Sequence, residues 1–150
     1  MKFGIVDPRA ARCEIIEAPD IPSAMTEIGL VSGQTDHDTI VCTAGGGIGM
    51  LSYEFGLFLP TSEQRYFSVG RMLIGGAALF YRFDAGGDTD NLEEMPPIVF
   101  YRDAREVESM IRLGMIDRPQ IKINDDIIWR WPDRPVEEGR IARMRGRGKL

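Results

Sequence analysis

Histidine most often carries acid–base or metal chemistry near neutral pH, and this chain has a single one, His37, between Asp36 and Asp38. Aspartate and histidine together form many transition-metal sites. Neighbouring residues of an extended chain point to opposite faces, so these three side chains do not converge on one ion. We therefore expect residues 36–38 to form a solvated loop, and the sequence shows no Ser/His/Asp or Cys/His arrangement for nucleophilic catalysis.

A second candidate is the glycine run at residues 45–49, which follows a predicted strand as phosphate-binding loops do. The dinucleotide fingerprint needs a glycine at the sixth position of its motif, and counting from Gly45 that position holds Met50. No Lys-Ser/Thr pair follows, so the run is not a Walker loop. The run instead predicts a loose glycine turn between two strands.

Acidic side chains between residues 84 and 94 are a candidate site for a hard cation: Asp84, Asp88, Asp90, Glu93 and Glu94. Their spacing does not follow the EF-hand loop, and we expect a solvated loop. Two cysteines, Cys13 and Cys42, are too few for a structural zinc site or a disulfide framework. We therefore predict a protein without catalytic residues, bound metal or cofactor, and not an enzyme.

Aromatic and basic residues are the better candidates for ligand binding. Trp129-Arg130-Trp131 places two indoles on one strand face, as a core or dimer contact or as a platform that stacks a base. The ligand-binding candidates are Tyr81, Arg82, Asn91, Arg112, Arg118 and Trp129. Trp129 and Trp131 are also interface candidates, and we expect a two-fold homodimer joined there. The alternative is a monomer in which a helix over 104–113 covers this strand.

Charge is unevenly distributed along the chain. The formal net charge is −5, but residues 133–150 hold six basic and three acidic side chains, a net of +3, and the remainder carries −8. The acidic body repels phosphate backbones, whereas a basic arm binds nucleic acid or the acidic surface of a partner. The tail residues proposed for such a contact are Arg140, Arg143, Arg145 and Arg147.

Alternating apolar residues indicate which strands position these groups. They predict a hairpin from Phe3 to Ile15 with a turn at residues 7–10, and a second hairpin from Thr39 to Phe58 across the glycine run. A long strand is predicted over 72–83, with Gly75-Gly76 as a bulge inside it. Further strands are predicted at 98–101 and 121–131, the second split by a turn at 125–126.

Two short helices are predicted from their end signals. Asp20 is the N-cap of a helix that ends before Gly29, and Asp103 is the N-cap of a helix over 104–113 that stops at Gly114. These elements predict an α+β fold, a mainly antiparallel sheet built from hairpins and packed by two short helices. We expect residues 1–132 to form one compact domain and residues 133–150 to form a basic tail.

Length and composition limit the class of protein. The chain has 150 residues, of which 43% are hydrophobic and 27% charged, values typical of one globular domain. No stretch approaches 18 uninterrupted apolar residues, and the N-terminus has no apolar region like that of a signal peptide. We therefore expect a cytoplasmic protein that does not bind membranes.

Short segments in the first half of the chain carry a resemblance: Ile5-Val6-Asp7-Pro8, Glu27-Ile28-Gly29, Tyr53-Glu54-Phe55-Gly56-Leu57 and Gly76-Ala77-Ala78-Leu79. Over residues 3–84 the order of these segments resembles an uncharacterised small domain family of phage, plasmid and bacterial proteins. The chain departs from that family at 69–72, where a proline-containing segment is missing. The resemblance implies a phage or mobile-element context and no catalytic residues. Small phage proteins of this kind often act by stoichiometric binding, and some block host defences.

These observations predict a non-enzymatic accessory protein that binds a host protein or a small ligand, with counter-defence as one such role. One alternative is a binder or sponge of a signalling nucleotide, in which Trp129 or Tyr81 stacks on the base and Arg112 or Arg118 pairs with phosphate. Another alternative is a nucleic-acid-binding accessory protein that acts through its basic tail.

Overall fold

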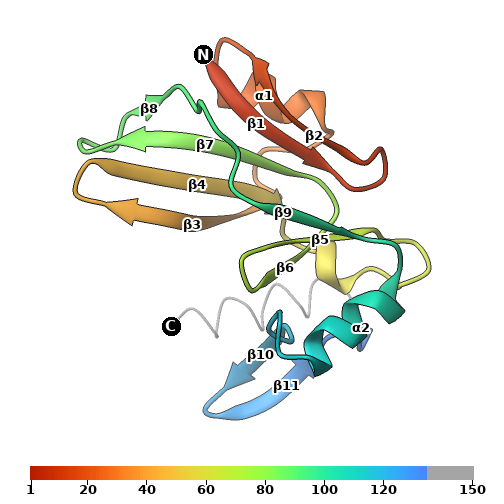
Figure 1. Cartoon of the computed structure of the whole chain (residues 1–150). Helices are drawn as coiled ribbons and strands as arrows, with labels where there is room; N and C mark the ends of the chain where they lie inside the picture. Colours follow the sequence, from red (N-terminus) through yellow and green to blue (C-terminus); the bar gives the residue numbers. More distant parts are fainter. Residues whose placement is uncertain (135–150) are drawn as a thin grey trace.

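The computed structural model describes residues 1–134, and its largest element is an antiparallel sheet of six strands, here sheet A. The strands pair in the order β2-β1-β7-β4-β3, and β8 pairs with the end of β7 that β1 leaves uncovered (Figure 1). Their bounds are β1 (Lys2–Asp7), β2 (Arg12–Glu17), β3 (Thr35–Thr43), β4 (Gly46–Tyr53), β7 (Ala78–Asp84) and β8 (Thr89–Asp90).

A second antiparallel sheet, sheet B, has three strands in the order β6-β5-β9. The strands are β5 (Tyr66–Val69), β6 (Met72–Gly75) and β9 (Ile98–Tyr101), and a 3-10 turn, η1 (Gly56–Phe58), precedes them in the chain. The long strand predicted over 72–83 is wrong, because β6 ends at Gly75 and the chain crosses to sheet A before β7. A Cβ on Gly75 would overlap the carbonyl oxygen of Gly56, so glycine permits the close approach at this crossing.

Both helices begin and end where the sequence indicates. In α1 (Ile21–Glu27) the Asp20 side chain accepts a hydrogen bond from the Ser23 N–H at 2.9 Å, and in α2 (Ala104–Arg112) the Asp103 side chain accepts from Glu106 at 3.0 Å. Gly114, after α2, has a φ of 74°, which glycine adopts without strain.

The chain after α2 forms the predicted split hairpin. It consists of β10 (Gln120–Ile123) and β11 (Asp126–Arg130), joined by Asn124 and Asp125. Both turn residues have positive φ, a conformation that asparagine and aspartate tolerate well.

Three apolar clusters hold these elements together as layers. In Figure 1 sheet A lies at the top with α1, sheet B in the middle, and α2 with the β10–β11 hairpin at the bottom. Buried residues fill each gap: Phe3, Ile5, Met25 and Leu79 between α1 and sheet A; Val6, Met50, Phe67 and Phe80 between the sheets; Tyr66, Val107, Trp129 and Trp131 between sheet B and the α2–hairpin layer. The described chain is thus the predicted α+β fold of mainly antiparallel sheets packed by two helices.

Two local predictions in the β3–β4 hairpin are corrected. Residues 36–38 are not a solvated loop, because they belong to β3 and pair with Leu51 and its neighbours in β4. The glycine run is not a loose turn either: Ala44 and Gly45 alone connect the strands, and Gly46, Gly47 and Gly49 lie inside β4. The sequence misleads here because glycine disfavours strands unless a close approach requires it.

Two predictions remain, one on membrane-spanning helices and one on the C-terminal tail. Among residues 1–134, no helix has the length and apolar character that crossing a bilayer requires. The predicted basic tail, with Arg140, Arg143, Arg145 and Arg147, lies outside the described residues from position 135 onward.

Candidate functional site

Tyr81 is held by other residues of sheet A. Its ring stacks on His37 with ring centroids 5.8 Å apart, and its hydroxyl shares a hydrogen bond with His37 Nε2. Burial raises the pKa of the Tyr81 hydroxyl, so this group stays protonated at neutral pH. The ring also covers Gly49 of the neighbouring strand. One face of Tyr81 is therefore already occupied by protein.

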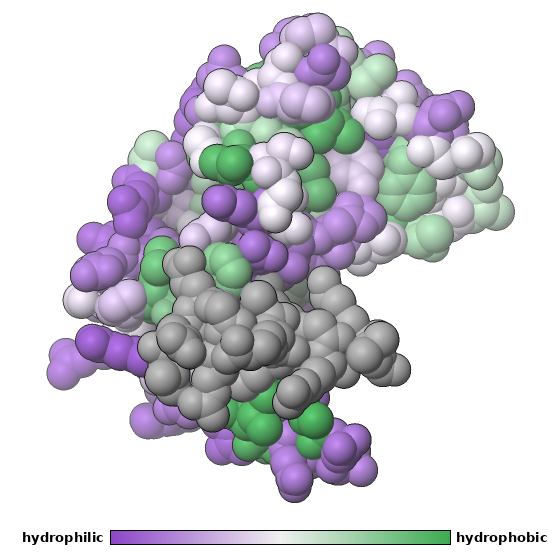
Figure 2. Space-filling model, turned by 180° about the vertical axis from the view of Figure 1, so that it is seen from behind, coloured by the Kyte–Doolittle hydropathy of each residue, from purple (hydrophilic) through white to green (hydrophobic). Residues whose placement is uncertain are grey.

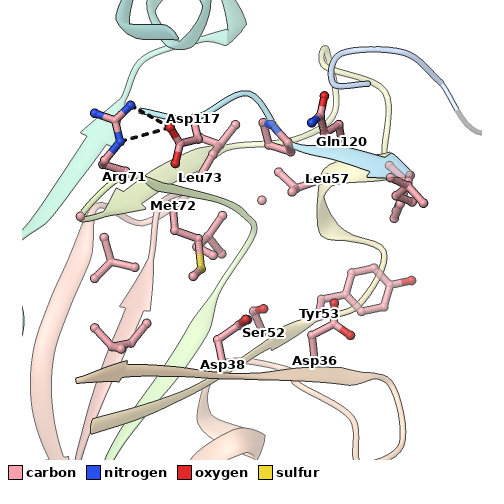
Figure 3. A pocket seen from close by; sticks show the side chains of 18 of the residues that line it. Asp36, Asp38, Ser52, Tyr53, Leu57, Arg71, Met72, Leu73, Asp117 and Gln120 are labelled. Carbon is pink, nitrogen blue, oxygen red and sulfur yellow. Dashed lines mark hydrogen bonds and ion pairs between the residues drawn. The ribbon is translucent and has the colours of Figure 1, made fainter. Parts of the chain in front are cut away.

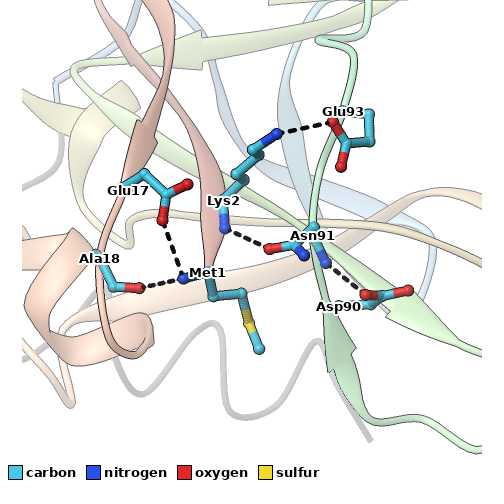
Figure 4. A network of polar contacts seen from close by, with 7 residues as sticks. All are labelled: Met1, Lys2, Glu17, Ala18, Asp90, Asn91 and Glu93. Atoms are coloured by element: carbon cyan, nitrogen blue, oxygen red, sulfur yellow. Dashed lines mark hydrogen bonds and ion pairs between the residues drawn. The ribbon is translucent and has the colours of Figure 1, made fainter.

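Asn91 belongs to a network that ties the N-terminal strand to the segment after β8 (Figure 4), and Arg82 approaches this network through Asp90. Asn91 Oδ1 accepts a hydrogen bond from the Lys2 backbone N–H at 2.8 Å, and the Asn91 N–H donates to Asp90 Oδ1 at 2.7 Å. The Arg82 guanidinium lies 3.7 Å from Asp90. These contacts give Arg82 and Asn91 a structural role at the edge of sheet A.

Arg112 and Arg118 both approach Glu108 of α2. Arg118 donates two hydrogen bonds to the Glu108 carboxylate and a third, of 2.9 Å, to the Trp131 carbonyl oxygen. Arg112 Nε lies 3.8 Å from the same carboxylate. The hydrogen bond from Arg118 holds the pKa of Glu108 below its usual range. Arg118 therefore fastens the hairpin to α2, and a phosphate group would have to displace Glu108 from it.

The two tryptophans are inside the fold. Trp131 is 1% exposed and packs edge-on against Tyr66, while Trp129 is 5% exposed and packs against Phe58. Val107 of α2 belongs to the same cluster, so α2 helps to cover this strand, as in the monomer alternative. Because both indoles are buried within a single chain, the structure gives no support to a dimer joined at Trp129 and Trp131.

The predicted ligand-binding residues therefore do not form one site. Tyr81 and Arg82 lie on sheet A with Asn91 just after β8, while Arg112, Arg118 and Trp129 lie around α2 and the hairpin at the other end of the molecule. Within residues 1–134 no group of three or more His, Cys, Asp or Glu side chains gathers where it would hold a metal ion.

A cleft of about 610 Å³, here the inter-sheet cleft, lies between the two sheets. It opens where β3 and β4 extend beyond sheet B, and the segment leading into β10 closes its other side (Figure 3). Its lining comes from β3–β4 (Asp36, Asp38, Ile40, Ser52, Tyr53), from η1 (Leu57, Phe58), from sheet B (residues 69–75), and from Asp117, Pro119, Gln120, Ile121 and Trp129. A volume of this size accommodates a small molecule or several residues of a peptide.

One wall of the inter-sheet cleft is apolar. Leu57, Leu73, Ile121 and Trp129 line it, and Phe58 and Leu73 are also members of the cluster under α2. The apolar wall is therefore an opening of the core itself, held in place by buried packing. Such preformed apolar walls with few polar groups are typical of ligand sites.

The polar side of the cleft is mainly acidic. Asp36 and Asp38 alternate along β3, so both carboxylates face the cleft while His37 lies on the opposite face of the strand (Figure 3). Across the cleft, Asp117 accepts hydrogen bonds from Arg71 at 2.7 and 3.1 Å, and Arg71 also donates to the Gly114 carbonyl oxygen at 2.6 Å. The cleft therefore holds three carboxylates and one guanidinium, and that guanidinium is already paired.

A smaller hollow of about 390 Å³ lies between the end of α1 and the start of β7, lined by Asp7, Arg9 and Gln64 among others. Gln64 is 4% exposed, and its side chain donates to the Gly56 carbonyl oxygen at 2.9 Å and accepts from the Arg65 N–H at 2.9 Å. Its amide thus supports the local backbone. Ile28, Leu30 and Val31 also line this hollow, which is smaller than the inter-sheet cleft.

Sequence reasoning missed the inter-sheet cleft. The signal for its acidic side was present: Asp36, Asp38 and Ile40 alternate in a segment whose neighbours Thr39 and Val41 favour strands. Arg71 and Asp117 meet through the packing of sheet B on the segment after α2, and nothing near either residue in sequence indicates their pairing.

No family model, curated protein or solved structure matches this chain. The resemblance seen over residues 3–84 therefore gains no support from these comparisons.

Proposed function

We propose that the protein is a stoichiometric binding protein whose inter-sheet cleft takes a ligand that is apolar along one side and positively charged along the other. The observation that carries the proposal is the pairing of an apolar wall, at Leu57, Ile121 and Trp129, with the carboxylates of Asp36 and Asp38 across one cleft. An exposed peptide segment of a host protein with arginine or lysine beside aliphatic residues has this chemistry.

Electrostatics favours a cation over a nucleotide in this cleft. A phosphate group would meet the Asp36 and Asp38 carboxylates, and the Arg71 guanidinium already pairs with Asp117. The arginines first nominated for phosphate, Arg112 and Arg118, are engaged with Glu108. The nucleotide-sponge alternative therefore receives no support from the described geometry.

The biological setting of the proposal comes from the resemblance over residues 3–84. It favours an accessory protein of phage or mobile-element type that acts on a host protein, counter-defence included. The proposal assigns no catalytic role to any residue, because the mechanism it describes is binding alone.

The experiment measures peptide affinity by fluorescence anisotropy. The probe is a labelled hexapeptide that alternates leucine and arginine, and its matched control replaces arginine with glutamate. We expect the full chain to bind the arginine peptide with a 1:1 stoichiometry and the glutamate peptide not at all. The change of Asp36→Asn together with Asp38→Asn should weaken binding at least about tenfold, because each removes a charge-assisted contact.

The matched variant Asp125→Asn with Asp126→Asn removes the same charge from the exposed turn of the β10–β11 hairpin. It should leave peptide affinity unchanged. Equal affinity for the arginine and glutamate peptides, or equal loss in both double variants, would overturn the proposal.

A further inference from the structure

We propose that the basic segment 140–147 of this chain is itself an occupant of the inter-sheet cleft and competes there with outside ligands. This inference rests on the proposed function, because it requires a cleft that recognises positive charge beside apolar side chains. The segment lies outside the described residues, and its sequence is Arg-Ile-Ala-Arg-Met-Arg-Gly-Arg.

Charge complementarity is the first reason. The segment carries Arg143, Arg145 and Arg147 two residues apart, the same spacing as Asp36 and Asp38 on the cleft wall. Arginine binds carboxylates through two parallel hydrogen bonds, which gives such a pairing direction as well as strength. Residues 135–150 have five basic and two acidic side chains, whereas the rest of the chain is strongly acidic.

The apolar side chains of the segment are the second reason. Ile141 and Met144 interrupt the arginines and would otherwise add apolar surface to a solvent-exposed arm. Leu57 and Ile121 offer an apolar wall beside the acidic one. Methionine adapts to irregular apolar surfaces, so a segment of this composition suits both sides of the cleft.

The course of the chain is the third reason. The last described residues leave the fold beside the cleft: Trp129, a lining residue, donates from Nε1 to the Asp133 carbonyl oxygen at 2.6 Å, and the Asp133 N–H donates to the Arg130 carbonyl oxygen at 2.8 Å. The nine residue-to-residue steps from Arg134 to Arg143 span up to about 30 Å when extended. A tether of this length keeps the segment at an effective concentration on the order of 1 mM at the cleft.

The experiment uses the full chain and the same leucine–arginine hexapeptide. Changing the tail arginines to glutamine should free the cleft and tighten the peptide's apparent Kd at least about tenfold, since the tethered competitor is lost. The tail changes are Arg140→Gln, Arg143→Gln, Arg145→Gln and Arg147→Gln. A matched control removes four positive charges from residues outside the cleft lining: Arg105→Gln, Arg112→Gln, Lys122→Gln and Arg130→Gln. The control should leave the affinity unchanged.

The outcomes separate this inference from the proposed function. If the hexapeptide binds the wild-type and tail-variant chains equally, the tail does not occupy the cleft, while the proposed function stands. If it binds neither chain, the proposed function fails and this inference with it. If the tail variant instead loses affinity for a DNA oligonucleotide with no change for the hexapeptide, the tail serves nucleic acid and the inference is overturned. Tightening that is abolished by adding Asp36→Asn and Asp38→Asn supports it.

Discussion

At the scale of single residues, the glycines of β4 show how a motif for ligand binding is used for packing. An added Cβ on Gly47 would overlap the Val41 carbonyl oxygen, at a point where β3 and β4 shift register. At Gly49 it would overlap the ring of Tyr81. These glycines are therefore required by neighbours on both sides of the strand, and nothing in their positions calls for a phosphate.

We therefore expect alanine substitutions at different positions of the glycine run to lower the stability of the fold by different amounts. Gly47→Ala should destabilise the fold by at least about 2 kcal/mol, because a backbone oxygen cannot move aside without breaking the strand pairing. Gly45→Ala is the matched control: its Cβ would meet nothing closer than Thr43 Oγ1 at 3.9 Å, so stability should change little. Urea denaturation monitored by circular dichroism measures both. Equal effects of the two substitutions would contradict the packing role of Gly47.

At the scale of elements, the β10–β11 hairpin depends on its tryptophans. Trp131 is buried beneath Arg118 and α2, and the hairpin joins the fold through that cluster rather than by pairing with sheet A or sheet B. Two apolar side chains of β11 are exposed, in contrast to Trp131: Ile127 is 44% exposed and Ile128 39%. Figure 2 shows hydrophobic atoms at this lower end of the molecule, among hydrophilic residues.

Trp131→Ala should therefore lower the free energy of unfolding by about 3–5 kcal/mol, as expected for a large core aromatic side chain. The control Ile127→Ala changes an exposed side chain of β11 and should alter the free energy of unfolding by less than about 1 kcal/mol. Denaturation curves give the free energies, and light scattering gives the mass of each variant. A Trp131→Ala chain that stays as stable as wild type but falls from dimer to monomer would restore the interface role.

At the scale of the whole molecule, each layer packs its apolar side chains against the next layer. Sheet A contacts α1 on one face and sheet B on the other, and sheet B contacts the α2–hairpin layer in turn. No layer has a core that is closed without its neighbour. We therefore expect the layers to unfold together as one cooperative unit.

The chain's two tryptophans test this expectation because both lie in the cluster under α2. Met25→Ala removes a side chain that is 6% exposed at the opposite end of the molecule, beside α1. It should lower the urea midpoint seen by tryptophan fluorescence as much as the midpoint seen by circular dichroism. A shift in circular dichroism alone would show that the layers unfold independently.

Much of the architecture was determined by the sequence alone. The caps Asp20 and Asp103, the turns after β1 and β10, and the short apolar run of β9 each depend on a few neighbouring residues, so local chemistry predicts them. The α+β class followed from the same signals. The crossing at Gly75 and the strand placement of Gly47 did not, because glycine gives the same local signal in a turn, a bulge and a close approach.

The candidate site was decided only by the tertiary structure. Its walls combine β3, η1, sheet B and the segment before β10, and the residues that meet there, such as Asp38 and Ile121, are far apart in the chain. The residues nominated from sequence were selected by type, but in the folded chain Arg118 pairs with Glu108 and Trp131 is buried in the core. Whether a side chain can reach a ligand depends on how the fold buries it and on which neighbours it contacts. These are long-range contacts, and no local sequence pattern predicts them.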